Sequence, residues 1–236
     1  VIRALEAEGI APDAARLEAY ALRRARADDE YERDAQAATR PAVTLQGERV
    51  QVLLNVSTLE ELDSIDPAIC DGIGLVRTEL LFAHGPPDES TQVTFYRRLL
   101  EWAGGRPVVI RTLDAGGDKP IAGVTIDGES NPFLGVRGVR LSLAAPQVFK
   151  VQLRALLAAA VAGDLRIMLP MITAPAEVTK VRALLAQAAT ELDAEHRSYA
   201  LPPLGIMVEV PAAALALEAF DVDFASIGSN DLLQYT

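Results

Sequence analysis

Short apolar segments alternate with longer amphipathic stretches along most of the chain, at intervals of about 25–35 residues. This alternation predicts βα units and a parallel sheet. The expected strands lie near residues 51, 73, 109, 135, 167, 207 and 225, and the expected helices near 57–65, 90–103, 145–162 and 175–192. A closed (β/α)8 barrel needs one strand more than these seven. The pattern therefore predicts an α/β fold, a (β/α)8 TIM-type barrel that is truncated after strand seven.

The first part of the chain has a different pattern. Residues 12–38 carry many charged side chains and only a thin apolar stripe, which is typical of a solvated helix. A proline at position 41 ends this stretch, because a proline ring cannot continue a helix. We expect residues 1–41 to be a helical linker from an upstream domain that this sequence does not include, and residues 42–236 to form the barrel.

Composition narrows the possible functions. The net charge of −11 argues against nucleic-acid binding. No apolar run approaches the roughly 18 residues of a membrane helix, so we expect no membrane insertion. The start of the chain lacks the pattern of a signal peptide, and a single cysteine excludes an internal disulfide. We therefore expect a cytoplasmic protein.

Two acidic residues follow the last two expected strands. Glu209 comes after an apolar segment that begins at Gly205, and Asp231 follows the segment 222–227. Because the carboxyl ends of parallel strands meet at one edge of a sheet, both carboxylates can face the same ligand. Mg²⁺ is commonly bound by one or two carboxylates together with substrate oxygens. The alternative is that Glu209 caps the next helix and Asp231 lies in a turn.

Three arginines stand at the ends of consecutive expected strands: Arg77, Arg111 and Arg137. Each one alone is typical of a surface salt bridge. Three of them at one mouth of a barrel would repel each other unless an anion lay between them. With a divalent cation at Glu209 and Asp231, the mouth suits a small phosphorylated carboxylic acid.

Other reactive residues are weaker candidates. Lys119 lies in a glycine-rich loop and is either an exposed lysine or a phosphate contact. His84 and His196 occur in segments typical of an exposed loop or helix end, so neither is a good nucleophile. Cys70 is expected to be a packing residue.

Six ordered motifs carry a family resemblance. They are GIGLVRTELLF (72–82), VVIRTLDAGGDK (108–119), NPFLGVRGVR (131–140), LRIMLPMI (165–172), GIMVEVPAAA (205–214) and SIGSNDLLQYT (226–236). Residues 43–236 resemble the phosphoenolpyruvate-binding barrel of the Enzyme I family, the phosphoenolpyruvate–protein phosphotransferases of the bacterial sugar phosphotransferase system. The wider family includes pyruvate phosphate dikinase and phosphoenolpyruvate synthase.

The resemblance implies roles for the candidate residues. It implies phosphoryl binding by Arg77, Arg111 and Arg137, a phosphate contact by Asn230, and Mg²⁺ ligation by Glu209 and Asp231. In the family, the histidine that accepts the phosphoryl group belongs to an upstream domain. The proton-donor cysteine and a fourth phosphate-binding arginine are expected beyond Thr236. We therefore expect no catalytic residue in this chain, and no turnover by the chain alone.

The implied partners are phosphoenolpyruvate, the carrier protein HPr (through the upstream domain) and a second copy of the intact protein. Two alternatives stay open. The first is the dikinase or synthase branch, in which an upstream ATP-binding domain would couple the same half-reaction to ATP. The second is a non-catalytic dimerisation or regulatory module.

Overall fold

A computed structural model describes residues 14–38, 40–116, 121, 125, 131 and 133–236. The chain divides into two compact units, Val1–Val50 and Gln51–Thr236. Lys119 lies outside the described residues.

The first unit contains helix α2 (Ala14–Ala37) and a small hairpin of β1 (Ala42–Val43) and β2 (Arg49–Val50). The two strands are antiparallel, with Ala42 opposite Val50. The described side chains of α2 are exposed, as its charged composition predicts. No helix within the described ranges is long and apolar enough to cross a membrane.

The second unit is built on one six-stranded parallel sheet whose strand order follows the chain. The strands are β3 (Leu53–Val56), β4 (Gly72–Val76), β5 (Val108–Arg111), β6 (Leu165–Leu169), β7 (Leu204–Val208) and β8 (Phe224–Ile227). The sheet curls into a half-barrel, which confirms the expected α/β fold of a truncated TIM-type barrel. Since every strand runs in the same direction, all carboxyl ends lie along one edge.

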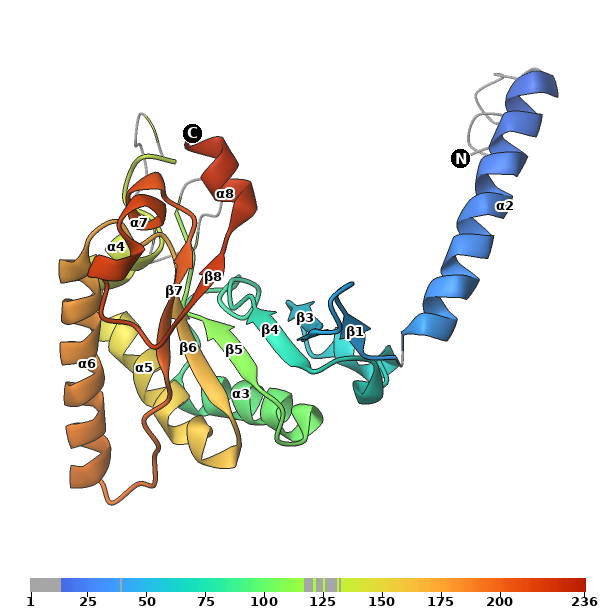
Figure 1. The fold of residues 1–236 in the computed structure, drawn as a ribbon. Helices are drawn as coiled ribbons and strands as arrows, with labels where there is room; N and C mark the ends of the chain where they lie inside the picture. Colours follow the sequence, from blue (N-terminus) through green and yellow to red (C-terminus); the bar gives the residue numbers. More distant parts are fainter. Residues whose placement is uncertain (1–13, 39, 117–120, 122–124, 126–130, 132) are drawn as a thin grey trace. The chain divides into compact units, whose positions relative to one another are not determined.

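Three long helices pack along one face of this sheet (Figure 1): α3 (Glu89–Ala103), α5 (Pro146–Ala159) and α6 (Pro175–Ala194). The shorter helices are η1 (Glu60–Ser64), η2 (Pro67–Ile69), α4 (Val139–Ala144), η3 (Ala160–Ala162), α7 (Pro211–Leu215), η4 (Leu217–Ala219) and α8 (Ser229–Gln234). Asp88 begins α3 by accepting a hydrogen bond from the Thr91 amide, and Gly104 ends it in the left-handed conformation. Prolines open α5 and α6.

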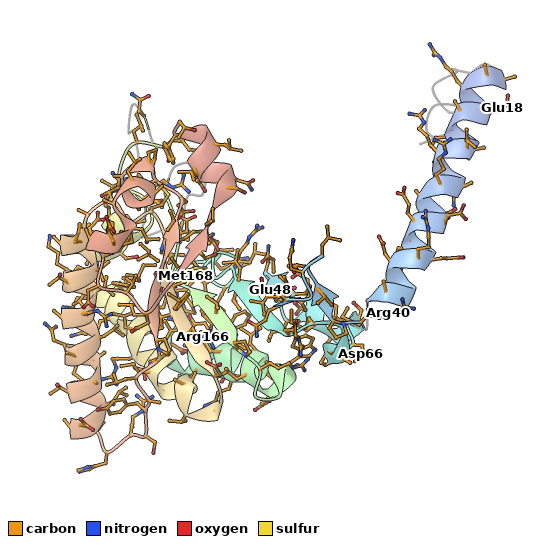
Figure 2. All side chains as sticks on the ribbon, in the orientation of Figure 1. Glu18, Arg40, Glu48, Asp66, Arg166 and Met168 are labelled. Atoms are coloured by element: carbon orange, nitrogen blue, oxygen red, sulfur yellow. The ribbon has the colours of Figure 1, made fainter. Side chains whose placement is uncertain are left out.

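The two faces of the sheet carry different cores. On β6, Ile167 and Leu169 belong to the large apolar core that includes the residues of α3, α5 and α6. Met168, labelled on β6 in Figure 2, instead packs with Val109 and Met207 in a small cluster of its own. Side chains alternate along a strand, so this small cluster fills the inside of the curl.

Two elements differ from the sequence-based expectation. Residues 133–137 were expected to form a strand, but they form turns and bends, so the described residues contain six barrel strands instead of seven. Phe133 and Leu134 point largely to solvent, and Gly138 (φ 57°) turns the chain directly afterwards. The helix expected at 57–65 is only the 3₁₀ helix η1.

Candidate functional site

The carboxyl edge of the sheet holds a cavity of about 770 Å³. Its wall includes residues that directly follow β4, β7 and β8, and the last residue of β5. The lining residues that carry charged or amide side chains are Asn55, Arg77, Glu79, Arg111, Glu209, Asn230 and Asp231. Parallel pairing explains this gathering, because it brings segments distant in sequence to one edge.

Arg111 is the most constrained of the cavity-lining arginines. Its side chain is 6% exposed and forms ion pairs with Glu79 and with Asp114, whose Oδ2 lies 3.3 Å from Nη2. The Thr78 hydroxyl donates a 3.0 Å hydrogen bond to the Arg111 carbonyl and so fixes the end of β5 against the β4 loop. The Nε of Arg111 is buried and has no hydrogen-bond partner among the described residues. Arg77 lies on the same wall but is exposed.

Asp114 joins two of the predicted arginines. It is fully buried, and its carboxylate lies 3.3 Å from both Arg111 Nη2 and Arg137 Nη2. A Cβ on Gly138 would lie 3.3 Å from Asp114 Oδ1 and only 2.7 Å from the Met171 Cβ. A glycine at position 138 therefore supplies both the positive φ and the space beside this carboxylate.

Arg137 is buried and connects the loop before α4 to helix α8. Its Nη1 lies 3.3 Å from Asp231 Oδ1 and donates a 3.3 Å hydrogen bond to the Tyr235 hydroxyl. That hydroxyl in turn donates to the carbonyl of Phe133 at 2.6 Å. Burial alone lowers the pKa of Arg137, but the carboxylates of Asp114 and Asp231 outweigh it and the pKa is raised. Arg137 is therefore a permanent cation.

Glu209 is a buried carboxyl group at the end of β7, and it is 1% exposed. Its Oε1 accepts a 2.7 Å hydrogen bond from the Met171 amide, a residue held at φ 55°. Burial raises the pKa of Glu209 to about 7, the Met171 hydrogen bond opposes the rise, and the negative charges of Asp114 and Asp231 add to it. Burial therefore favours the protonated form of this group, while the nearby Arg111 guanidinium favours the ionised form.

One oxygen of the Glu209 carboxylate lies beside Gly228. A Cβ on Gly228 would lie 2.9 Å from Glu209 Oε2, so glycine leaves this oxygen accessible. Asp231 interacts electrostatically with Glu209 and, like it, lines the cavity. Within the part of the chain that the structure describes, no group of three or more histidine, cysteine, aspartate or glutamate residues could hold a metal. Two carboxylates fit Mg²⁺, which takes its remaining ligands from water and substrate, better than a cation that needs a full protein cage.

The structure brings most of the predicted residues together. Arg77, Arg111, Glu209, Asn230 and Asp231 line the cavity, and Arg137 lies behind it in contact with Asp231. Glu209 does not cap α7, whose N-cap is Val210, while Asp231 lies in the first turn of α8.

The arginines were expected to repel each other unless an anion lay between them, and the structure places the carboxylate of Asp114 between Arg111 and Arg137. Glu79 and Asp114 neutralise Arg111, and Asp114 also contacts Arg137. Sequence reasoning missed both acids, although they stand two and three residues after Arg77 and Arg111 in the motifs quoted for these arginines.

The remaining reactive residues lie away from this cavity. His84 and His196 are exposed, as expected, and His196 stands just past the end of α6. Cys70 is buried, in agreement with a packing role.

The comparison with known proteins agrees with this geometry. The family model described as "PEP-utilising enzyme, PEP-binding domain" matches residues 31–236. A phosphoenolpyruvate-protein phosphotransferase of Haloferax volcanii is 45% identical over 200 residues, covering 81% of this chain and 35% of that protein. The enzyme of the same name from Haemophilus influenzae is 38% identical over 232 residues, covering 96% of this chain and 40% of that protein.

A multiphosphoryl transfer protein of Rhodobacter capsulatus is 41% identical over 208 residues, covering 86% of this chain and 24% of that protein. This chain thus spans 40% or less of each of these relatives. The matched segment includes the whole six-stranded sheet and every charged residue of the cavity. The chain therefore belongs to the PEP-utilising enzymes and carries their PEP-binding domain.

Proposed function

We propose that the cavity binds phosphoenolpyruvate together with Mg²⁺, as the substrate site of a phosphoenolpyruvate–protein phosphotransferase. The observation that carries this proposal is the meeting of arginines and carboxylates in one cavity at the carboxyl ends of the strands. Phosphoenolpyruvate carries its phosphate and its carboxylate on the same carbon, so it needs several donors within a small volume. Arginine suits both groups because its planar fork binds two oxygens at once.

Each cationic residue has a distinct part in this proposal. Arg77 is exposed on the cavity wall and is available to meet the incoming phosphate. Arg111 lines the cavity, and its buried Nε lacks a hydrogen-bond partner among the described residues. Arg137 adds positive charge from behind Asp231, and Asn230 offers an amide at the cavity rim. These donors would stabilise the negative charge on the phosphoryl oxygens as it is transferred.

Glu209 and Asp231 would hold the metal. The charged side chains around the cavity are three arginines and four carboxylates, namely Arg77, Arg111 and Arg137 with Glu79, Asp114, Glu209 and Asp231. A site with this excess of acid is poorly suited to an anion until a cation joins it. Glu209 and Asp231 would hold Mg²⁺, which when bound would supply positive charge toward the substrate oxygens.

In the reaction that we propose, a histidine outside this chain attacks the phosphorus of phosphoenolpyruvate in line with the bridging oxygen. The new N–P bond forms as the P–O bond breaks, and the enolate that leaves is protonated to pyruvate. The histidine then passes the phosphoryl group to the carrier protein HPr. The names of the relatives support this branch over the ATP-coupled dikinases and synthases. We also propose that the intact protein is cytoplasmic, acts in sugar uptake and is a homodimer.

Isothermal titration of the chain with phosphoenolpyruvate, with and without Mg²⁺, tests the proposal. We expect binding that requires or is strengthened by Mg²⁺, and that Arg77→Ala weakens. Arg182→Ala is the matched control, because this arginine forms a surface ion pair with Asp221 and does not line the cavity. If phosphoenolpyruvate does not bind under either condition, the non-catalytic alternative replaces this proposal.

A further inference from the structure

A relay of buried polar side chains links the helices to the loop that follows β5. The Leu113 amide donates to Gln152 Oε1 at 3.1 Å, and Gln152 Nε2 donates to the Tyr96 hydroxyl at 3.3 Å. Tyr96 donates to Gln92 Oε1 at 3.1 Å, and Gln92 Nε2 donates to the Pro87 carbonyl at 3.0 Å. Gln92 and Tyr96 belong to α3 and Gln152 to α5. These three side chains are named the glutamine–tyrosine relay below.

Each hydrogen bond of the glutamine–tyrosine relay has a fixed donor and a fixed acceptor. Tyr96 is fully buried, and Gln92 and Gln152 are each 1% exposed. Burial strongly raises the pKa of Tyr96, so its hydroxyl keeps its proton and acts as a donor. Because the Leu113 N–H must face an acceptor, the Gln152 amide can adopt only one of its two orientations, and the orientation of each later member follows.

The end of the relay lies next in sequence to the charged residues that follow β5. Leu113 stands between Arg111 and Asp114, and the Asp114 carboxylate contacts both Arg111 and Arg137 at 3.3 Å. The neighbouring Thr112 amide is fixed separately, by a 2.9 Å hydrogen bond to the Met168 carbonyl. Gln152 thus holds the N–H of the Thr112–Leu113 peptide, one residue before the bridging acid Asp114.

We infer that Gln152 is a positioning residue for the anion-binding arginines, acting through the Leu113 peptide and Asp114. This inference rests on the proposed function for the anion-binding role of Arg111 and Arg137. Rotation of the Leu113 peptide would move the Asp114 carboxylate, and the guanidinium groups of Arg111 and Arg137 would follow it. The helical layer, which touches no substrate, therefore sets the geometry at the strand ends.

Variants at two buried residues distinguish a positioning role of Gln152 from a general loss of stability. Gln152→Met keeps the length and volume of the side chain but removes the acceptor opposite Leu113. Tyr96→Phe, the matched control, removes a buried hydroxyl of the same relay but leaves the Leu113–Gln152 hydrogen bond in place. Both lose buried hydrogen bonds, so both are expected to lower the midpoint of urea unfolding.

We expect Gln152→Met to speed hydrogen exchange of the Leu113 amide and to shift the Nε–H resonances of Arg111 and Arg137 in a ¹H–¹⁵N spectrum. Its affinity for phosphoenolpyruvate and for inorganic phosphate should fall about tenfold, the size of one lost hydrogen bond. Tyr96→Phe should change each of these by less than about threefold. Equal losses in the two variants, or unchanged arginine resonances in Gln152→Met, would overturn the inference.

The two proposals can fail separately. If the wild-type chain does not bind phosphoenolpyruvate, the proposed function fails, while the arginine resonances and the Leu113 exchange rate still decide the role of Gln152. Should Gln152→Met not fold, Gln152→Glu takes its place, because it retains an acceptor opposite Leu113. If the Leu113 amide of that variant still exchanges slowly and the resonances of Arg111 and Arg137 are unchanged, the positioning role is supported. If the Leu113 amide exchanges slowly but the arginine resonances are displaced, the positioning role is contradicted.

Discussion

Replacing Asp231 with asparagine tests whether metal and substrate share the cavity. In the structure Asp231 is paired with Arg137 at 3.3 Å, and it also lines the cavity, as does Glu209. One carboxylate is therefore both the partner of a proposed anion-binding arginine and a proposed metal ligand. If Asp231 binds Mg²⁺, Arg137 loses one acidic partner. Arg137 can then donate its hydrogen bonds more readily to the substrate anion. Metal and phosphoenolpyruvate must then bind with positive coupling, each raising the other's affinity by the same factor.

The size of the effect follows from the contacts. At an effective dielectric constant of about 20, the Coulomb attraction across 3.3 Å is about 5 kcal/mol before the costs of desolvation and screening. The Asp231 side chain is 22% exposed, so the net contribution is much smaller. The loss of one charged partner suggests about 1.5–3 kcal/mol, or a factor of roughly 10–150 in the Mg²⁺-dependent affinity. Without Mg²⁺, Asp231→Asn should bind phosphoenolpyruvate as tightly as the wild type or slightly more tightly, because Asp114 is then the only acidic partner of Arg137 among the described residues.

Titration calorimetry of phosphoenolpyruvate with and without Mg²⁺ measures both quantities. Asp221→Asn is the matched control, because this aspartate lies just before β8 and its side chain is 94% exposed. We expect the control to reproduce the wild-type coupling and Asp231→Asn to lose most of it. Equal phosphoenolpyruvate affinities with and without Mg²⁺ in the wild type, or no effect of Asp231→Asn, would refute the shared-site reasoning.

Three further predictions follow from the structure. The pKa of Glu209 rises from 4.5 to about 7 on folding, so its stabilising neutral form is fully present below about pH 4.5 and is lost as pH rises through 7. In EDTA, Glu209→Gln should therefore be the more stable protein above pH 7, by up to about 3 kcal/mol, with little difference at pH 4. Arg154 joins α3, α5 and α6 through ion pairs with Glu89, Glu191 and Glu195, so Arg154→Met should lower the free energy of unfolding at pH 7 by about 1–3 kcal/mol. Incubation with labelled phosphoenolpyruvate should leave the mass of the chain unchanged at alkaline pH, because His84 and His196 are exposed and do not line the cavity.

Each of these has a result that would contradict it. A wild-type protein that gains stability steadily from pH 5 to 8 in EDTA would show that Glu209 is ionised without cost. The pKa of Glu195 is lowered by its hydrogen bond to Arg154, so the Arg154→Met deficit should shrink as the pH falls below 4.5. A deficit that stays constant down to pH 3 would mean that lost packing, and not charge, explains it. A stable phosphohistidine in the chain would overturn its assignment as a substrate-binding domain alone.

The fold was largely predictable because strand and helix periods alternate clearly. The strands at 53–56, 72–76, 108–111, 165–169, 204–208 and 224–227 all fall in predicted segments. The failure at 133–137 has a physical cause. A short segment with only three apolar side chains is ambiguous unless these side chains can be buried, and here Phe133 and Leu134 remain 38% and 68% exposed. Asn131 before the run and Gly138 after it favour turns.

The sequence predicted many of the residues that form the site, but not which of them form ion pairs with each other. Strand-end positions identified Arg77, Arg111 and Glu209, because in a parallel sheet these positions must share an edge. The partners of each residue depend on which neighbouring loops approach, and sequence spacing does not contain that information. The role of Gln152 was invisible for the same reason, because it acts on Leu113 across 39 positions of sequence.

The ion pairs among these residues affect how the proposed anion would bind in the cavity. Charges alternate along a continuous path from the end of β4 to helix α8: Glu79, Arg111, Asp114, Arg137 and Asp231. Each arginine in this path already has two acidic neighbours, and the carboxylate of Asp114 lies between the two arginines, so their approach requires no bound anion. An incoming phosphate gains little from relieving repulsion and must instead add to, or exchange with, the existing acceptors. The acids at the two ends, Glu79 and Asp231, both line the cavity and are the acceptors that a ligand can replace.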